Sequence, residues 1–244
     1  MCTVTYIPVK DSCYIISNRD ERFIRKEAIP PAANNMNGNI LLYPKDADAG
    51  GTWITATGDG HAGVLLNGAF EKHMPSPPYR KSRGLVFLEI MEAECPVSFF
   101  SAINLRDIEP FTLITLAGEL HECRWNGRQK FILPLQKQQP YIWSSVTLYD
   151  EMIKKEREKW FSEFMEKHPM PTMTEALAFH QFAGEGDQHK DLRMNRKNEV
   201  FTVSITGMHI RKQDCRMRYH ELSSGKVYHE TLAFCTPSVK DSFQ

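Results

Sequence analysis

Residues 1–21 read MCTVTYIPVKDSCYIISNRDE, and most of what the sequence says about the fold starts from this stretch. Two runs, 3–8 and 13–17, are rich in apolar, β-branched and aromatic residues, and Lys10-Asp11 separates them. Two such runs across a short polar break predict an antiparallel hairpin. The second strand of that hairpin ends in the polar stretch 17–21, so we expect this stretch to lie beside the beginning of the chain.

The remaining strand and helix signals fall in clusters along the chain. Strands are predicted at 52–56, 62–66, 111–114, 120–125, 131–133, 141–143, 201–205, 215–222 and 227–234. Helices are predicted at 82–92, from Pro96 to about residue 105, at 148–168, and from a Thr174 cap to residue 183. Groups of strands that alternate with groups of helices, without regular βαβ units, favour the α+β class. No linker divides the chain, which predicts one domain over 1–235 and a polar tail over 236–244.

Two polar segments, 22–48 and 154–159, are predicted to lie at the surface. Residues 22–48 are rich in proline and asparagine, which predicts a long loop. Long loops in compact domains are often functional, so this one is expected to form a wall or lid over a site. The charged run 154–159 is interpreted as a solvated helix face.

Composition and the distribution of charged, apolar, cysteine and histidine residues argue against several classes of partner, cofactor and cellular location. The 244 residues contain 30 basic and 30 acidic side chains, and this balance gives no electrostatic reason to expect nucleic acid or an anionic membrane as the main partner. No apolar run approaches the roughly 20 residues that span a bilayer, so no integral membrane contact is expected. The N-terminus lacks the features of a signal peptide, and six dispersed cysteines without a CxxC pair favour a reduced, cytoplasmic compartment. The nine histidines form no ligand pattern, which predicts neither a metal nor another cofactor.

Cys2 carries the first chemical signal. A small second residue permits removal of Met1, which would give Cys2 both a thiol and a free α-amine. An α-amine has a pKa of roughly 7.7–8.0, so it can act as a base near neutral pH. An amine on the same residue can then activate the thiol without a separate histidine. The alternative interpretation is a small buried residue that opens a strand.

The polar stretch at the end of the second strand offers partners for Cys2. Arg19 would lower the pKa of a neighbouring thiol, because a nearby cation stabilises the thiolate. Asp20 would accept a hydrogen bond from the α-ammonium and orient it. The alternative is a solvated turn with a surface ion pair, which contributes little to stability.

Four segments in order, 1–3, 18–21, 49–53 and 65–67, resemble those of the NRDE family, also called the transport and Golgi organisation protein 2 family. Ser82-Arg83-Gly84 is similar to a further landmark of the family, and the resemblance runs from Met1 to about residue 234. The family is considered related to N-terminal-nucleophile hydrolases, and the opening is similar to that of choloylglycine hydrolases and penicillin V acylases. The resemblance implies a four-layer αββα sandwich.

The resemblance also implies roles for individual residues. Cys2 would be the nucleophile, with Arg19 and Asp20 beside it, and Asn67 would donate to the oxyanion. The alternative for Asn67-Gly68 is a plain hairpin turn. Three further residues, Asn18, Trp53 and Ser145, are expected to contact the substrate, and Trp53 is expected to form core or pocket wall. Ser145 stands where the family usually has an asparagine, and it offers a hydroxyl in place of a planar amide.

These observations favour a cysteine amidohydrolase or acyltransferase that acts on a non-peptide C–N bond of a small-molecule amide or acyl substrate. One alternative is a binding protein for lipid or haem that keeps the fold without turnover. A third interpretation is an interaction module in which residues 18–21 are purely structural. The sequence does not indicate the substrate or the oligomeric state.

Overall fold

The computed structural model describes residues 2–197 and 199–235, with the side chain of Cys2 outside the described part. Seven strands form one antiparallel sheet in the order β10-β1-β2-β12-β13-β14, with β11 paired to β12. Their bounds are β1 Cys2–Val9, β2 Ser12–Arg22, β10 Tyr141–Ser144, β11 Asn195–Arg196, β12 Val200–Ile210, β13 Asp214–Glu221 and β14 Val227–Ala233. Seven more strands form the second antiparallel sheet in sequence order: β3 Ile29–Met36, β4 Asn39–Lys45, β5 Ile54–Thr57, β6 Ala62–Asn67, β7 Phe111–Ala117, β8 Glu119–Trp125 and β9 Lys130–Leu135.

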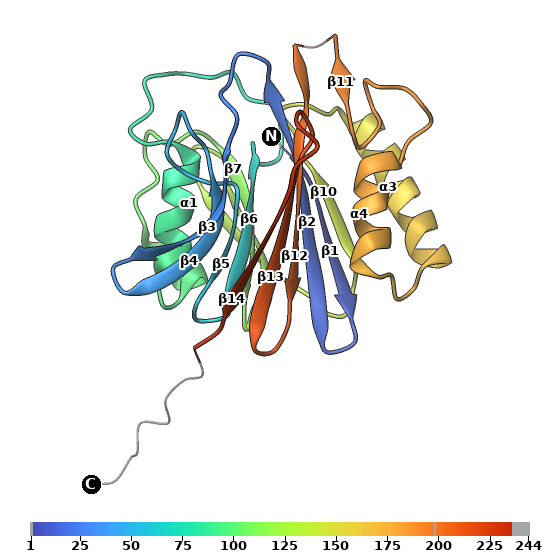
Figure 1. Cartoon of the computed structure of the whole chain (residues 1–244). Coiled ribbons are helices and arrows are strands. Elements are labelled where there is room, and N and C mark those ends of the chain that lie inside the picture. The colour runs from blue at the N-terminus through green and yellow to red at the C-terminus, as the bar shows by residue number, and fades with distance from the viewer. Residues whose placement is uncertain (1, 198, 236–244) are drawn as a thin grey trace, which may run out of the picture.

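Helices cover the outer face of each sheet, as Figure 1 shows. Helices α1 (Arg83–Glu92) and α2 (Pro96–Ala102) pack on the second sheet, mainly on β6 and β7. Helices α3 (Glu151–Lys167) and α4 (Met173–Phe182) pack on the first sheet, α3 mainly on β10 and α4 mainly on β2 and β12. The predicted αββα sandwich of the α+β class is therefore confirmed. Among the described residues, no helix is long and apolar enough to cross a membrane.

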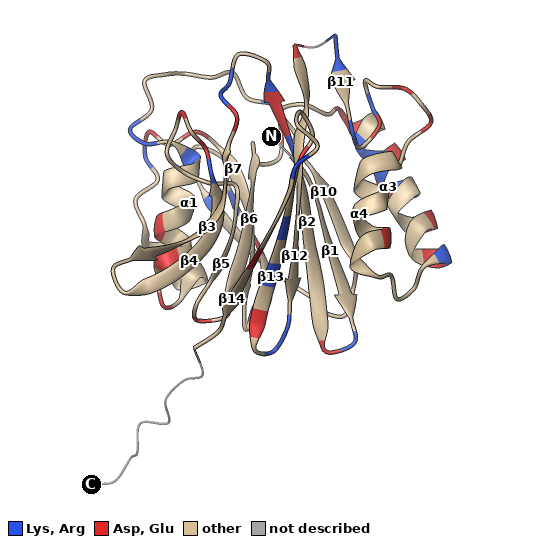
Figure 2. Ribbon diagram, in the orientation of Figure 1, with Lys and Arg blue, Asp and Glu red and all other residues tan. Residues whose placement is uncertain are grey.

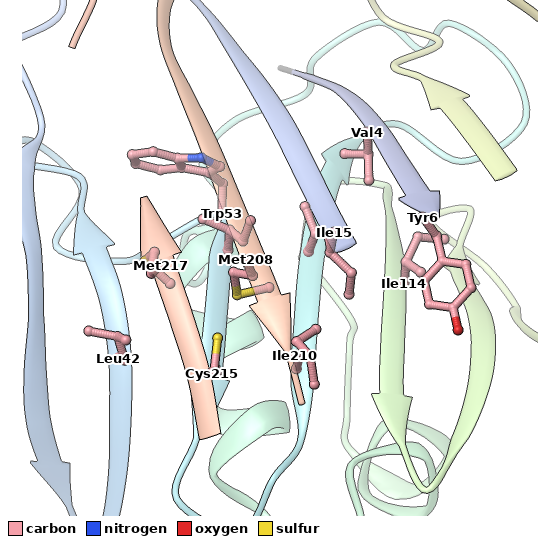
Figure 3. Packing of buried hydrophobic residues seen from close by; sticks show 14 of the residues in the cluster. Val4, Tyr6, Ile15, Leu42, Trp53, Ile114, Met208, Ile210, Cys215 and Met217 are labelled. Carbon is pink, nitrogen blue, oxygen red and sulfur yellow. The ribbon is translucent and has the colours of Figure 1, made fainter. Parts of the chain in front are cut away.

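The central core lies between the two sheets. Val4 and Ile15 from the first sheet and Ile114 from the second belong to one buried cluster (Figure 3). Burying these side chains removes apolar surface from water at roughly 25 cal/mol per Å². Because side chains alternate along a strand, the residues of β2 between those of the central core face the helices, and Tyr14 and Ile16 pack in the α3/α4 cluster.

The predicted N-terminal hairpin is present. Strands β1 and β2 pair from Val9 opposite Ser12 to Cys2 opposite Arg19. The turn contains Lys10 with a φ of 49°, a left-handed conformation that tightens the reversal. The hairpin therefore returns the polar end of β2 to the start of the chain.

The predicted loop over 22–48 is wrong, because most of it forms the hairpin of β3 and β4. Pro30 and Pro31 are tolerated because β3 is the edge strand of its sheet. Asn37 and Gly38, with φ of 48° and 95°, form the two-residue turn that joins the strands. The loop signals marked an edge strand and a tight turn, so the expected lid is reduced to the two ends of the segment.

Two helix details also differ from the predictions. The cap of α4 is Thr172, not Thr174, and its hydroxyl and the Glu175 carboxylate form a capping box. The run 154–159 is not wholly solvated, because Arg157 is fully buried in α3. It stands four residues from both Ile153 and Phe161, on the apolar face of the helix.

Candidate active site

A cavity of about 870 Å³ opens at the end of the sandwich where β1 begins. Its size suits a small-molecule ligand. Three sequence-predicted residues line it: Arg19 at the end of β2, Trp53 before β5 and Asn67 at the end of β6. Arg19 lies on the first sheet and Asn67 on the second, so the cavity is built where the two sheets separate.

Strand alternation divides the polar residues of β2 between two environments. Arg19 and Glu21 line the cavity, whereas Asn18 and Asp20 face the helices and do not line it. The sequence had predicted that these neighbours form one group around Cys2. The structure instead assigns them to opposite faces of the sheet, because successive side chains of a strand point to opposite sides.

Arg19 is held by both charge and packing. Its guanidinium donates to Asp46 at 2.8 Å and lies 4.6 Å from the centre of the Trp53 ring. Glu21 is a second, weaker partner at 3.5 Å. The side chain is almost completely buried, so it presents a fixed cation at the cavity wall instead of a mobile surface charge.

Asp46 is a site residue that the sequence analysis missed. One carboxylate oxygen accepts from the Asp48 and Ala49 amides, and the other accepts from Arg19 and from Arg25 at 2.7 Å. Burial acts to raise the pKa of Asp46, but the Ala49 amide and the two guanidinium groups hold it below its ordinary value. An aspartate that starts a turn before glycines gave a local signal, although not its partners.

Asp20 is completely buried on the helix side of β2. Tyr149 donates its hydroxyl hydrogen to one carboxylate oxygen and Thr202 donates to the other, both at 2.7 Å. Burial raises the pKa of Asp20, whereas Arg157 and the two hydroxyl donors act to lower it. Asp20 therefore holds the end of β2 from the helix-covered face of the sheet, and it does not line the cavity.

Arg157 completes this buried network and was also missed. Its guanidinium donates to the Thr3 hydroxyl of β1 and to the carbonyl oxygens of Lys190 and Asp191. It also lies 3.7 Å from the centre of the Tyr149 ring. The helical spacing described above was the available signal, because it places Arg157 between two apolar positions of the buried face.

Asn18 is held by three groups of the described part of the chain. Its amide nitrogen donates to the carbonyl oxygens of His180 and Leu192, and its oxygen accepts from the His180 ring at 2.7 Å. The other ring nitrogen of His180 lies 2.8 Å from the Thr5 hydroxyl. The expected substrate contact of Asn18 is not supported by this geometry, because the side chain is fully buried away from the cavity.

The histidine in this network predicts a pH dependence of stability. Burial, with a smaller effect of Arg157, lowers the pKa of His180 to about 3, so the folded chain holds it neutral. The unfolded chain binds a proton near pH 6.5, and stability that is complete above this value falls as the pH falls towards 3. Between pH 7 and pH 5, His180 should remove about 2 kcal/mol of unfolding free energy. Urea unfolding at both values, compared with His180→Gln, measures this, and an equal pH dependence in the variant would contradict it.

Asn67 and Ser145 are neighbours with different surroundings. The Ser145 hydroxyl donates to the backbone oxygen of Asn67 at 2.8 Å and lies 2.9 Å from the Thr147 hydroxyl. Ser145 lines a second cavity of about 250 Å³, which Asn67 also borders, and it does not line the larger one. Ser145 therefore holds the Asn67 backbone. The chain continues from Asn67 into the segment before α1, so the alternative of a hairpin turn at Asn67-Gly68 is wrong.

The two glycine-containing motifs meet at the cavity wall. A Cβ atom on Gly51 would lie 2.4 Å from the carbonyl carbon of Gly84, and one on Gly84 would lie 2.9 Å from the Thr52 oxygen. Only glycine permits this approach of the two backbones. This contact positions the N-terminus of α1 at the cavity wall. Ser82 caps the helix there and lines the cavity.

An ion-pair chain on the same wall was also missed. Arg83 contacts Glu109 at 2.9 Å, and the other carboxylate oxygen of Glu109 lies 3.0 Å from His73. Burial lowers the pKa of the Arg83 guanidinium, and Glu109 opposes this effect. The described residues contain no group of three or more His, Cys, Asp or Glu side chains that could hold a metal ion.

A model of the Transport and Golgi organisation 2 family matches residues 1–223. The chain belongs to this family. No curated protein matches the sequence of this family member.

Solved structures with a similar fold share little sequence with this family member. An N-acylethanolamine-hydrolyzing acid amidase orthologue from Caenorhabditis elegans has a TM-score of 0.56 at 14% identity, covering 85% of this chain and 92% of that one. A mutant conjugated bile acid hydrolase from Clostridium perfringens has a TM-score of 0.59 at 9% identity, covering 97% of both chains. Penicillin V acylase from Agrobacterium tumefaciens has a TM-score of 0.59 at 12% identity, covering 94% and 85%. Because these identities are low, the likeness shows the fold alone, which is that of N-terminal-nucleophile hydrolases.

Proposed function

We propose that this protein is an N-terminal-nucleophile cysteine hydrolase that cleaves an amide C–N bond of a small molecule. One observation carries the proposal: Arg19 and Asn67, from different sheets, line one cavity, and the backbone of Cys2 pairs directly opposite Arg19. A nucleophile, a cation and an amide donor at one cavity are the groups that acyl transfer needs. The solved structures of similar fold include proteins whose names describe amide hydrolysis.

The proposed reaction begins after Met1 has been removed. The α-amine of Cys2 takes the thiol proton, and the sulfur attacks the amide carbonyl carbon. The Asn67 amide donates to the oxyanion that forms, and such a donor contributes roughly 3–4 kcal/mol. The C–N bond then breaks, and the leaving amine receives the proton held by the α-ammonium. Water attacks the resulting thioester, which releases the carboxylic acid and restores the thiol.

Within this proposal, Arg19 favours the thiolate, although it shares its charge with Asp46 and Glu21. Trp53 forms an apolar wall for the acyl group. Asp20 and Ser145 act as positioning residues, because Asp20 holds the end of β2 and Ser145 holds the backbone of Asn67. Direct contacts of Asp20 with the α-ammonium and of Ser145 with the substrate stay predictions.

Intact mass and thiol labelling test the proposal. The purified chain should lack Met1, and Cys2 should react first with iodoacetamide at neutral pH. Cys13 and Cys123 are poor competitors, because burial raises the pKa of each thiol to about 12. The exposed Cys95 and Cys235 are the informative internal controls. Equal labelling of these two and Cys2, or a chain that keeps Met1, would contradict the proposal.

A binding protein without turnover is the alternative, and the position of Ser145 favours it. The hydroxyl of Ser145 is engaged by the Asn67 carbonyl and by Thr147, so it offers no second oxyanion donor to the larger cavity. Under this alternative, Met1 is retained and Cys2 shows ordinary thiol reactivity. The same mass and labelling experiment therefore separates the two functions.

A further inference from the structure

Two large apolar side chains are exposed at the mouth of the larger cavity, the one of about 870 Å³. Phe23 and Ile24, in the connection between β2 and β3, are 72% and 83% exposed. Their neighbours Arg22 and Arg25 line the cavity, which places the pair at its rim. Side chains of this size gain free energy when they leave water, so their exposure on a rim calls for an explanation.

A second segment carries a similar side chain to the same mouth. Met74, in the segment 68–82 that precedes α1, is 87% exposed. The residues on either side of it, His73 and Pro75, line the cavity. Figure 1 shows this segment and the β2–β3 connection at the same end of the molecule, above the ends of the sheets. Two segments distant in sequence therefore present apolar tips around one opening.

Cations accompany the apolar tips. Residues 22–26 read Arg-Phe-Ile-Arg-Lys, and Lys72 stands two residues before Met74. Among the described residues, Arg22, Lys26 and Lys72 form no ion pair, whereas Arg25 is bound to Asp46. Two carboxylates, Glu27 and Glu71, lie nearby in sequence. Figure 2 shows basic residues of both segments at this end.

We propose that the cavity mouth docks on the surface of a bilayer that contains anionic phospholipid. Phe23, Ile24 and Met74 would enter the interfacial region, and Arg22, Lys26 and Lys72 would lie among the headgroups. Single apolar tips on separate segments suit a lipid interface, which needs no shape complementarity. A protein partner would instead need a packed apolar patch. The zero net charge of the chain conceals this local distribution, so composition gave no reason to expect it.

Vesicle sedimentation tests the docking independently of any catalytic activity. The full chain is mixed with phosphatidylcholine vesicles that contain either no anionic lipid or about 30% phosphatidylserine. We expect the anionic vesicles to bind at least about tenfold more tightly, and about 0.5 M salt to weaken this binding. The double variant Phe23→Ser/Ile24→Ser should lose about tenfold or more of the affinity, and Met74→Ser several-fold.

A matched control is Met170→Ser. Met170 is 52% exposed in the connection between α3 and α4, which Figure 1 shows at the other end of these helices from β11. This variant should bind as the unmodified chain does, and thermal unfolding checks that all variants fold. No vesicle binding, no preference for phosphatidylserine, or an equal loss in Met170→Ser would overturn the proposal. Capture by polyglutamate without vesicle binding would overturn it in favour of an acidic protein partner.

Discussion

Replacing Arg157 by methionine is expected to lower the free energy of unfolding by about 3–5 kcal/mol. The guanidinium is fully buried and satisfies the Thr3 hydroxyl and two backbone carbonyl oxygens. Methionine fills similar space but leaves those acceptors without donors, and it removes the cation that favours the ionised form of Asp20. Urea unfolding at neutral pH measures the loss.

The pH dependence of that loss distinguishes the electrostatic contribution of Arg157 to the unfolding free energy from its packing contribution. Asp20 already has a raised pKa in the folded chain, and removal of Arg157 raises it further. A carboxyl with a raised folded pKa destabilises the chain as the pH rises above about 3.9, its value when unfolded. The cost of Arg157→Met should therefore be smaller near pH 4.5 than near pH 7. Adding Asp20→Asn should recover part of the loss at pH 7.

Lys155→Met is the matched control for this experiment, because Lys155 is an exposed cation on the same helix. Its replacement should change the unfolding free energy by less than about 0.5 kcal/mol. An equal loss in both variants would contradict the prediction. The buried network would then contribute little to stability.

Replacing Cys2 by alanine is expected to lower amide hydrolysis by at least about 10³-fold, if the chain turns over an acyl p-nitroanilide. The proposed reaction has no other nucleophile, because the α-amine that remains serves only as a base. Asn67→Ala should give a smaller loss in kcat of about 10²–10³-fold with little change in KM, since an oxyanion donor acts in the transition state. Initial rates over a range of substrate concentrations give both values.

Cys95→Ala is the control for reactivity, because Cys95 is exposed and does not line the cavity. Its activity should equal that of the unmodified chain. Activity that survived Cys2→Ala would contradict the assigned nucleophile. Activity that survived Asn67→Ala but not Cys2→Ala would contradict only the oxyanion assignment.

Much of the fold could be predicted from local pattern. Two runs of apolar, β-branched and aromatic residues across a short polar break predicted the β1–β2 hairpin, and the hairpin places Arg19 opposite Cys2 without any distant contact. The helices were found for a similar reason, since the spacing of their apolar residues is also local, although the cap of α4 was misplaced by two residues. The segment 22–48 failed because proline and asparagine have the same signature in a loop, at an edge strand and in a tight turn.

The candidate site could be predicted only in part. The motif residues Arg19, Trp53 and Asn67 do line one cavity, but their chemical roles stay predictions. Asp46 was not predicted as a site residue, because its partners, Arg19 and Arg25, lie more than 20 positions away in sequence. A sequence pattern shows that a residue is polar and where it stands in an element, but it does not show which distant element faces it.

Sequence alone determined the α+β class and the hairpin that returns residues 17–21 to the beginning of the chain, because these depend on residue patterns and turns within a few residues. Tertiary structure decided the rest of the site. The pairing of β2 with β12 brings Thr202 to Asp20, and the packing of α3 buries Arg157 beneath the same strand. Local patterns fix the face that a residue presents. The partner on that face is set by how segments far apart in the chain pack together. The free energy of that packing depends on both segments, so the sequence of one segment does not reveal it.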